Sequence, residues 1–398
     1  MPIAPRSFTF TVLLGLFAAL PALSIDISAP TLPLLPAALE TSRTVAGLTL
    51  SLFMVGFALG HLGGGSLSDS KGRRPVLLGG LACFTIAGFA CALSLSGEAL
   101  AISRLIQGFG AGVCSVISFA MVQDLFEGDA ARAKRSYVTA IFGAVPILAP
   151  ALGSVMTDWF GWRSVHEVLA VAGGVLFAVA WTGVAESKLT SPDARTPGQR
   201  DAMPLWKDRR FIHVTLANAL SYGCIFAYIA ASPVVIMDQM GRSSTVFASL
   251  FACTAAALAL GAWTSGQLSR CGAGAAALVN PALIAAAATA LVLAAAGLGG
   301  ITTGTIIVPL LLVILFARGI IAPNLQHLAI EPQHGRAGKA SAAIGVSQLL
   351  SGALASAVMA FLLPLSGPGA VAATMAAFAA AALVTWRWSV HQDKALSR

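Results

Sequence analysis

Residues 9–33 read TFTVLLGLFAALPALSIDISAPTLP, an apolar run that carries one carboxylate, Asp26. A helix needs about 20 apolar residues to cross the roughly 30 Å of hydrocarbon in a bilayer. An ionisable side chain inside such a run persists mainly where it faces a bundle interior or a wet cavity, so Asp26 is a candidate functional residue. We expect the run to form a first membrane helix rather than a cleaved signal peptide, because its first apolar part is followed by Asp26 and three prolines instead of a small-residue cleavage site.

The composition is that of an integral membrane protein. Of 398 residues, 57% are hydrophobic and 10% are charged, and the mean hydropathy is +0.84; soluble domains carry about 25% charged residues. Apolar runs of membrane-spanning length recur near 9–33, 46–66, 75–95, 99–124, 136–157, 166–185, 211–235, 244–266, 273–297, 304–330, 338–364 and 368–388. The sequence therefore predicts an all-α membrane protein with twelve transmembrane helices in two six-helix halves.

The positions of Lys and Arg predict the orientation of the chain. With the N-terminus inside, 19 of these side chains fall in inner segments and three, Arg43, Arg163 and Arg242, fall outside. Cytoplasmic loops are enriched in Lys and Arg, so both termini are expected in the cytoplasm. This topology explains the formal net charge of +8, and no nucleic-acid partner is expected.

A polar stretch at 186–210 divides the spans into six and six. We interpret 1–185 as an N-terminal half, 186–210 as a cytoplasmic linker and 211–398 as a C-terminal half. Many transporters combine two such halves and bind a small-molecule substrate near the membrane midplane between them.

Three charged residues are expected deep in the membrane. Asp26 is the sole carboxylate far inside any predicted span, and the deep bases are Arg104 and Arg318. From a rise of about 1.5 Å per residue, Asp26 and Arg104 lie roughly 8 and 11 Å outward of their span centres, so we expect Arg104 to approach Asp26 directly or through water. Gln107 shares a helix face with Arg104. The alternative for Asp26 is a structural ion pair without proton traffic; Arg318 either faces the cavity as a counter-charge or bonds backbone carbonyls.

The fifth predicted helix contains two prolines four residues apart, which should bend it. A hinge or gate and close packing are both open as interpretations of the group Gly143, Pro146, Pro150 and Gly153. In the second helix, packing alone accounts for Gly56, Gly60 and Gly64, since small residues let membrane helices approach closely.

Substrate contacts are expected from aromatic and amide side chains, because cavities for small organic ligands are mostly apolar with a few polar groups. The candidates, for each of which helix packing is the alternative, are Phe17, Phe53, Asn218, Tyr222, Tyr228, Arg318 and Asn324. The sequence shows no phosphate-binding Gly-Lys-Ser/Thr motif, no nucleophile elbow and no metal-ligand pattern. We therefore expect neither an enzyme nor an ATP-driven pump, and no cofactor or metal.

The loop after the second span reads Gly65-Ser-Leu-Ser-Asp69-Ser-Lys-Gly72-Arg73-Arg74-Pro75. It resembles the loop signature of the major facilitator superfamily, which implies a cytoplasmic charge latch formed by Asp69, Gly72, Arg73, Arg74 and Asp124. Further stretches are similar to motifs of its Bcr/CflA drug-resistance branch. They are Ser24-Ile25-Asp26, Arg104-Leu-Ile-Gln107-Gly108 and Ala149-Pro150-Ala-Leu-Gly153.

This resemblance implies antiport: proton-coupled efflux of small hydrophobic drugs or toxic metabolites by alternating access. Protons are the expected coupling ion, with Asp26, Arg104 and Gln107 as the coupling residues. The chain is expected to act as a monomer in the bacterial cytoplasmic (inner) membrane. Proton-linked uptake of a metabolite and a non-transporting receptor or sensor are the alternative functions.

Overall fold

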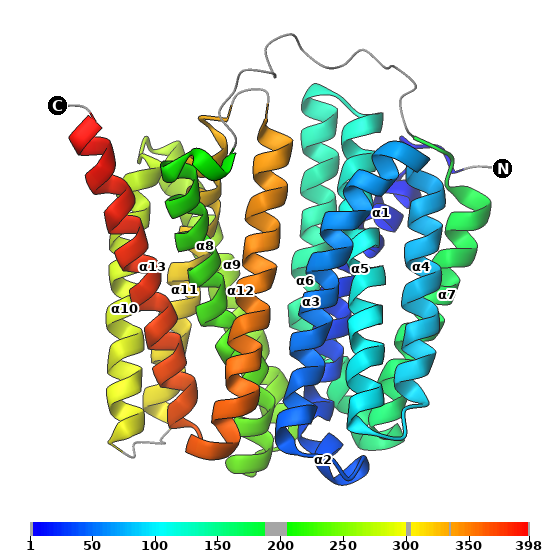
Figure 1. The fold of residues 1–398 in the computed structure, drawn as a ribbon, viewed down its shortest axis with the longest axis horizontal. Helices are drawn as coiled ribbons and strands as arrows, with labels where there is room; N and C mark the ends of the chain where they lie inside the picture. The colour runs from blue at the N-terminus through cyan, green and yellow to red at the C-terminus, as the bar shows by residue number, and fades with distance from the viewer. Residues whose placement is uncertain (1–2, 188–204, 300–303, 334–335, 397–398) are drawn as a thin grey trace. The chain divides into compact units, whose positions relative to one another are not determined.

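The computed structural model describes residues 3–187, 205–299, 304–333 and 336–396, and every regular element in these ranges is helical (Figure 1). The first part of the chain forms α1 (Phe8–Ser28), the 3-10 helix η1 (Ala29–Leu34), α2 (Leu35–Ala38), α3 (Arg43–Lys71), α4 (Arg73–Ala92), α5 (Gly97–Leu125), α6 (Gly128–Phe160) and α7 (Trp162–Gly183). The second part forms η2 (Leu205–Lys207), α8 (Arg209–Pro233), the π-helix η3 (Val234–Gln239), α9 (Ser244–Arg270), α10 (Ala275–Leu298), α11 (Gly304–Ile330), α12 (Ala337–Ser366) and α13 (Gly369–Leu396).

Twelve helices of the described chain are long and apolar enough to span a membrane, which confirms the number predicted from hydropathy. Each overlaps one of the predicted runs. The first is longer than expected and extends over Phe8–Ala38, because the chain tightens into the 3-10 helix at Pro30 and Pro33 instead of ending there. A proline lacks the backbone N–H that continues an α-helix, and a short 3-10 segment is a common way to carry the chain past it.

Helix ends follow local capping chemistry. The side chains of Ser7, Ser42 and Ser96 accept a hydrogen bond from the backbone N–H three residues later, at the starts of α1, α3 and α5. Gly72 separates α3 from α4 with φ of +100°, a conformation that glycine adopts without a Cβ penalty. The tight turn therefore fixes the positions of Asp69 and Arg73 on either side of it.

The residues cluster into two compact units, which are described separately. The first contains Met1–Thr190 and Ile236–Ala252, and the second contains Ser191–Val235 and Cys253–Arg398. The segment at 236–252 is tied to the first unit by an ion pair of 2.9 Å between Arg43 and Asp238 and by a hydrogen bond from Ser244 to Asp158. Of the predicted linker 186–210, residues 188–204 lie outside the described residues.

Close backbone contacts at glycines of both helices join α3 and α5 in the first unit. A Cβ on Gly56 or Gly60 would lie about 2 Å from the carbonyl oxygen of Leu105 or Phe109, and one on Gly108 would meet that of Phe53. The two helices are thus in contact through both of their glycine rows. The packing role predicted for Gly56 and Gly60 is confirmed, and the close fit fixes the height of Arg104 on α5.

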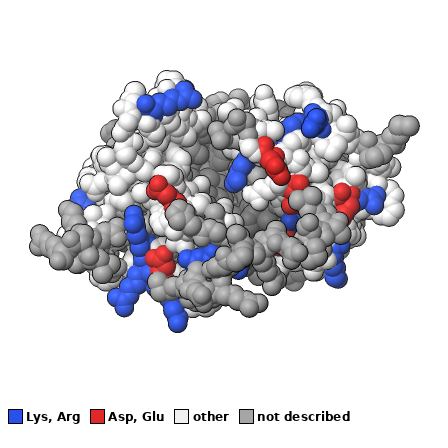
Figure 2. Space-filling model, turned by 90° about the horizontal axis from the view of Figure 1, so that it is seen from above, with Lys and Arg blue, Asp and Glu red and all other residues white. Residues whose placement is uncertain are grey.

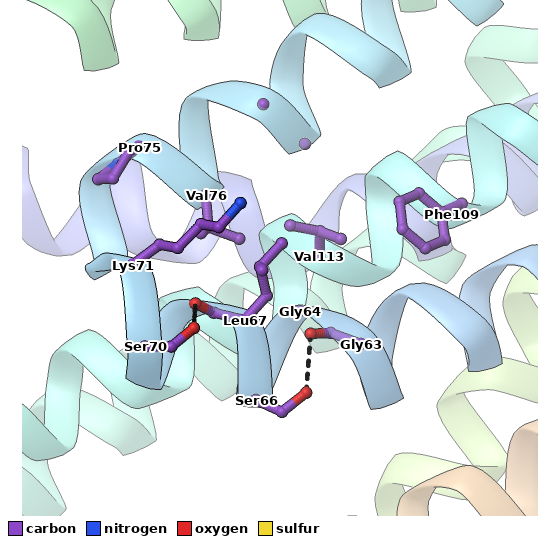
Figure 3. A pocket seen from close by; sticks show the side chains of 12 residues that line it. Gly63, Gly64, Ser66, Leu67, Ser70, Lys71, Pro75, Val76, Phe109 and Val113 are labelled. Carbon is purple, nitrogen blue, oxygen red and sulfur yellow. Dashed lines mark hydrogen bonds between the residues drawn. The ribbon is translucent and has the colours of Figure 1, made fainter.

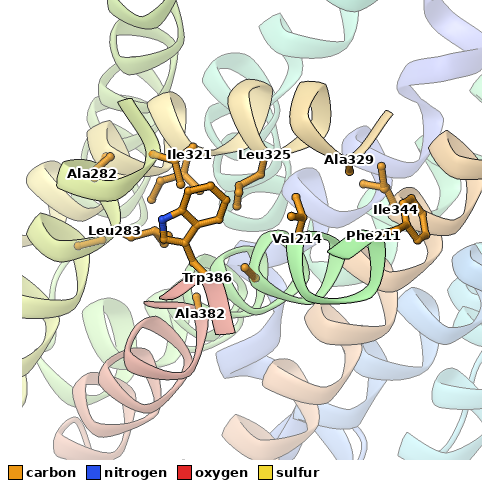
Figure 4. Packing of buried hydrophobic residues seen from close by; sticks show 14 of the residues in the cluster. Phe211, Val214, Ala282, Leu283, Ile321, Leu325, Ala329, Ile344, Ala382 and Trp386 are labelled. Carbon is orange, nitrogen blue, oxygen red and sulfur yellow. The ribbon is translucent and has the colours of Figure 1, made fainter. Parts of the chain in front are cut away.

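The second unit contains a mostly aliphatic core with two aromatic side chains, Trp386 and Phe211. Trp386 of α13 packs among Leu283 of α10 and Ile321 and Leu325 of α11, and the cluster continues along α8 to Phe211 (Figure 4). The core thereby holds α11, the helix that carries Arg318, against α8.

Candidate functional site

Arg104 is the centre of a buried polar cluster in the first unit. Its side chain lies on α5, is 3% exposed, and directs Nη1 to the Ser24 hydroxyl at 2.6 Å and Nη2 to the Ser28 hydroxyl at 3.2 Å. Nη2 also donates to the Ser24 carbonyl oxygen at 3.2 Å, and the guanidinium lies 4.2 Å from the centre of the Phe53 ring. The fork of donors thus binds one face of α1.

Asp26 lies on the same stretch of α1, between the two serines that bind Arg104, and is 5% exposed. Of the two predicted forms of approach between Arg104 and Asp26, the direct one is not found in this conformation: the Asp26 carboxylate has no ion pair or hydrogen bond within residues 3–187, 205–299, 304–333 and 336–396. The helix period explains why. Ser24 and Ser28 share a face, whereas a residue two positions away is rotated by about 200°. Arg104 therefore contacts the turn that carries the acid, but not the acid. An approach through water stays a prediction.

Gln107 joins Arg104 as expected from the shared helix face. Its Oε1 accepts from Arg104 Nη1 at 2.8 Å and lies 3.8 Å from the Cys91 sulfur of α4. Because a guanidinium only donates, this bond fixes the Gln107 oxygen toward Arg104 and its amide nitrogen away from it.

The group Gly143, Pro146, Pro150 and Gly153 lies on α6, and its two glycines differ in how closely they are packed. A Cβ on Gly153 would lie 2.1 Å from the carbonyl oxygen of Ile27, the residue after Asp26, whereas one on Gly143 would meet no heavy atom within 4 Å. Pro146 and Pro150 lie inside one continuous helix. Close packing therefore accounts for Gly153, and the hinge role of the group stays a prediction.

The charged residues at the α3–α4 turn form a compact network around Arg73. Its Nη1 lies 2.5 Å from Asp69 and 2.6 Å from the Ser68 hydroxyl, and its Nε lies 2.7 Å from Asp124 at the end of α5. Arg74 is directed differently and donates to the Trp181 carbonyl oxygen at 2.6 Å. The structure thus brings Asp69, Arg73 and Asp124 together and places Arg74 against α7.

A further member of this network was missed by the sequence reasoning. The carboxylate of Glu186, just after α7, accepts from the backbone N–H of Arg73 at 2.8 Å and of Arg74 at 3.1 Å. An anion at a helix N-terminus satisfies unpaired N–H groups and the positive end of the helix dipole. The sequence shows Glu186 only as an acidic residue at the start of the polar stretch 186–210. No sequence pattern relates this residue to α4.

A surface groove runs beside this network. Its cavity volume is about 680 Å³ and its walls include Gly63, Leu67, Lys71, Val76 and Phe109 (Figure 3). The hydroxyls of Ser66 and Ser70 bond carbonyl oxygens of their own helix, at Gly63 and Leu67, so they are not directed into it. The face seen in Figure 2 carries Lys and Arg side chains with Asp and Glu among them, in keeping with a polar, solvent-facing end.

Arg318 is the buried arginine of the second unit. It lies on α11, is 5% exposed, and donates from Nη1 to the Asn218 Oδ1 of α8 at 3.1 Å. Its guanidinium lies 5.8 Å from the centre of the Tyr222 ring. The structure thus brings together Asn218, Tyr222 and Arg318, and the partner of Arg318 is a side-chain amide rather than the backbone carbonyl that was one alternative.

The other expected cavity residues are mostly engaged in packing or helix contacts. Phe17 and Phe53 are fully buried. Asn324 donates to the Ser265 hydroxyl and the Ile320 carbonyl oxygen, both at 2.7 Å, and Tyr228 hydrogen-bonds Thr254. Tyr222 is only half-buried and packs on Phe226 with ring centres 4.8 Å apart. Contact with substrate stays a prediction for each of them.

Residues 12–356 match the Major Facilitator Superfamily, and the chain belongs to this family. It is a multi-pass membrane transporter and not an enzyme. The first step of the sequence-based assignment, the superfamily, is confirmed.

Several bacterial proteins are similar in sequence to this chain. An uncharacterized MFS-type transporter, YdgK of Bacillus subtilis, is 29% identical over 89% of each chain. The chloramphenicol resistance protein of Pseudomonas aeruginosa is 33% identical over 65% of this chain and 61% of its own length. The multidrug resistance protein MdtL of Shigella dysenteriae is 31% identical over 58% of this chain and 59% of its own. The matches to the two resistance proteins thus span about three fifths of their lengths.

Solved structures with the same fold include a D-xylose-proton symporter. It has a TM-score of 0.76 at 16% identity and covers 96% of this chain and 97% of its own. A bacterial homologue of the lysosomal transporter Spinster, inward-facing and occupied, also has a TM-score of 0.76, at 14% identity over 98% and 97% of the two chains. At these identities the likeness concerns the fold alone.

Proposed function

We propose that this transporter is a drug:proton antiporter of the Bcr/CflA branch, exporting small, largely hydrophobic drugs or toxic metabolites by alternating access. Its motifs around Asp26, Arg104 and Pro150 support that branch, and the printed names of two relatives refer to chloramphenicol and multidrug resistance. Antibiotic resistance would be the observable consequence in a bacterium.

One observation carries the proposal: a buried carboxylate without a polar partner, on a helix turn that a buried arginine binds from its other side. An ionised carboxylate away from water and without hydrogen bonds costs several kcal/mol, so its charge and its surroundings must change together. Proton binding removes the charge, and proton release requires water or a cation. Asp26 meets this description within the described residues, and Arg104 is the nearby cation.

The role proposed for Arg104 is to change the proton affinity of Asp26, by its positive charge, from the opposite face of α1. A helix backbone with side chains is about 10 Å wide, so a guanidinium on one face acts on a carboxylate on the other through a medium of low dielectric constant. Gln107 and the two serines hold the guanidinium in place. A shift of Arg104 off Ser24 and Ser28 would change the field at Asp26.

Alternating access needs a link between this site and the ends of the helices. We assign the Asp69, Arg73 and Asp124 network, together with Gly72, to a latch that stabilises one of the two states, and α6 around Gly143, Pro146, Pro150 and Gly153 to the element that bends. Gly153 supports this role through its contact with Ile27, one residue from Asp26. Substrate and proton then stabilise opposite states.

For the substrate we favour the half-buried Tyr222 together with Arg318 and Asn218 over the enclosed Phe17 and Phe53. The proposal further includes protons as the coupling ion with no bound cofactor, a monomer as the working unit, the bacterial cytoplasmic (inner) membrane as location, and cytoplasmic termini. The excess of Lys and Arg on the predicted inner segments supports this orientation.

Everted membrane vesicles test the function. After respiration has acidified their interior, chloramphenicol or another drug of a hydrophobic panel is added and the pH gradient is followed with a fluorescent dye. We expect drug-dependent collapse of the gradient in vesicles that contain the protein and none in vesicles without it. No drug of a broad panel collapsing the gradient, together with unchanged growth inhibition of expressing cells, would contradict export.

A further inference from the structure

The first unit contains a buried histidine that the proposed mechanism does not use. His166 lies on α7, is 2% exposed, and stacks edge-to-face on Trp162, with ring centres 5.9 Å apart and planes at 79°. Its Nδ1 has no hydrogen-bond partner in the described part of the chain, and Arg104 lies within electrostatic range of its ring. A buried imidazole nitrogen of this kind requires a polar neighbour.

A second buried polar atom without a partner in the described residues lies on the adjoining helix. It is Nε2 of Gln107, a fully buried residue whose oxygen is bound to Arg104. The position of this nitrogen is defined by Gly88 of α4: an added Cβ there would lie 3.2 Å from Gln107 Nε2 and 3.0 Å from the Ala170 Cβ of α7. The amide and α7 therefore meet at the same notch in α4.

Ala170 is four residues after His166 and lies on the same face of α7. The missing side chain at Gly88 thus leaves room on α4 for both the Gln107 amide of α5 and Ala170 of α7, which is one helical turn from His166. An amide nitrogen only donates, whereas a neutral imidazole has one accepting nitrogen. The two unpaired atoms are chemically complementary, and leaving both unpaired is unfavourable.

We propose that one buried water bridges Nε2 of Gln107 and Nδ1 of His166, accepting a hydrogen bond from the amide and donating one to the imidazole, and that His166 thereby positions Arg104. This bridge holds the amide whose oxygen fixes the guanidinium, so a polar chain runs from Ser24 on α1 through Arg104 and Gln107 to His166 on α7. His166 is a positioning residue, neutral, with its proton on Nε2. Its effect on transport rests on the proposed function, whereas the contact itself does not.

His61 provides a matched control within the same unit. It also lies on a membrane helix, α3, stacks edge-to-face on an aromatic residue four positions earlier, Phe57, and has Nδ1 without a partner in the described chain. Unlike His166 it is only half-buried, and the proposed bridge to Gln107 does not involve it. Effects that come only from replacing a histidine packed on an aromatic ring of its own membrane helix should therefore appear at both positions.

The contact is tested by nitrogen NMR of protein labelled with ¹⁵N-histidine and reconstituted in liposomes. Signals of His166 and His61 are assigned from their loss in His166→Asn and His61→Asn. We expect Gln107→Leu to shift the ring nitrogens of His166 and to leave those of His61 in place. Ring signals of His166 that stay unchanged in Gln107→Leu would overturn the contact.

The positioning role is tested by comparing two transport modes in the same liposomes. Drug movement driven by a pH gradient needs the proton site, whereas exchange between two drug pools moves no net proton. We expect His166→Leu to slow the driven mode about tenfold, a difference of 1.4 kcal/mol, with exchange retained, and His166→Asn to recover part of the rate because its amide oxygen also accepts. His61→Leu should behave as wild type.

Equal rates of His166→Leu and wild type in both modes, or equal loss in both, would overturn the positioning role. A wild-type protein that exchanges drug but shows no gradient-driven movement would instead refute proton coupling, and the NMR shift would still decide whether His166 binds Gln107.

Discussion

Within the described residues, each unit contains one buried arginine on its fourth membrane helix, and the two are held in different ways. Arg104 directs four hydrogen bonds to Ser24, Ser28 and Gln107 and covers the Phe53 ring. Among the residues that the structure describes, Arg318 directs one hydrogen bond, to Asn218, and it lies farther from an aromatic ring, that of Tyr222. In both units the first helix supplies a polar partner, but only α1 also carries an acid, Asp26.

From this difference we infer that the two units have different functions. A guanidinium with several bonds is a rigid charge whose removal from its site requires a large structural change, and it lies beside a group that can take up a proton. A guanidinium with a single amide partner beside a half-buried tyrosine is freer to bind something else. We therefore place proton coupling in the first unit and substrate contact in the second.

The largest expected effect comes from replacing each arginine by lysine. Arg104→Lys keeps the charge but loses at least two charge-assisted hydrogen bonds, each contributing about 1.5–3 kcal/mol, so gradient-driven transport should fall about 100-fold. Arg318→Lys loses one bond at most and should slow transport about tenfold or less. Vesicle transport assays at matched protein amounts measure both, and equal losses in the two variants would remove the distinction between the units.

The next effect concerns the contact between α1 and α6. Gly153→Ala places a methyl group against the Ile27 carbonyl oxygen, an atom that cannot move without shifting α1, and should destabilise the protein by about 1–3 kcal/mol. Gly143→Ala enters open space and is the control. Thermal unfolding is followed with a thiol-reactive dye that reports the buried, free Cys91, Cys114 and Cys224, after the exposed Cys253 and Cys271 have been replaced by Ser in every variant. Equal melting temperatures would contradict the close packing.

Most of the fold could be predicted from the sequence, because each membrane helix is defined by its own apolar run. The twelve spans, the glycine contacts of α3 with α5, and the shared face of Arg104 and Gln107 all depend on local length and helix period. The rotation of α1 about its axis does not: it depends on which neighbour each face meets. This is why the depths of Asp26 and Arg104 indicated that the two side chains approach each other, directly or through water, while the structure places Arg104 on Ser24 and Ser28.

A smaller effect is expected at the α3–α4 turn. Arg73→Ala leaves Asp69 and Asp124 without their shared cation, and since the side chains of Arg73 and Asp124 are only 13% and 17% exposed, the loss should be about 1–2 kcal/mol. Arg74→Ala removes one exposed bond to a carbonyl oxygen and should cost less. The same dye-based unfolding assay ranks the two, and a larger loss for Arg74→Ala would show that Arg73 is not the centre of the network.

The smallest effect is that of Glu186. Glu186→Gln removes the negative charge from the N-terminus of α4 and should cost about 0.3–1 kcal/mol, less at high salt. Glu40→Gln, at an exposed position outside the network, is the control. A loss that does not depend on salt would indicate that the carboxylate acts through its hydrogen bonds and not through its charge.

The roles of Glu186 and His166 could not be predicted from the sequence, and the physical reason is the same for both. Glu186 acts on α4, more than a hundred residues earlier, and His166 of α7 is proposed to act on Gln107 of α5, about sixty residues earlier. A single acid after a span resembles any loop acid, and a single histidine in a span resembles a packing residue. Only the tertiary contacts distinguish them.

Asp26→Asn tests the proposed coupling most directly. Proton movement on addition of drug, and drug exchange between two pools, are measured in liposomes with wild type and with the variant, which keeps the size of the side chain but cannot ionise. We predict that the variant exchanges drug at close to the wild-type rate and moves no protons. Drug-driven proton movement that is unchanged in Asp26→Asn would contradict the assignment of the proton to this residue.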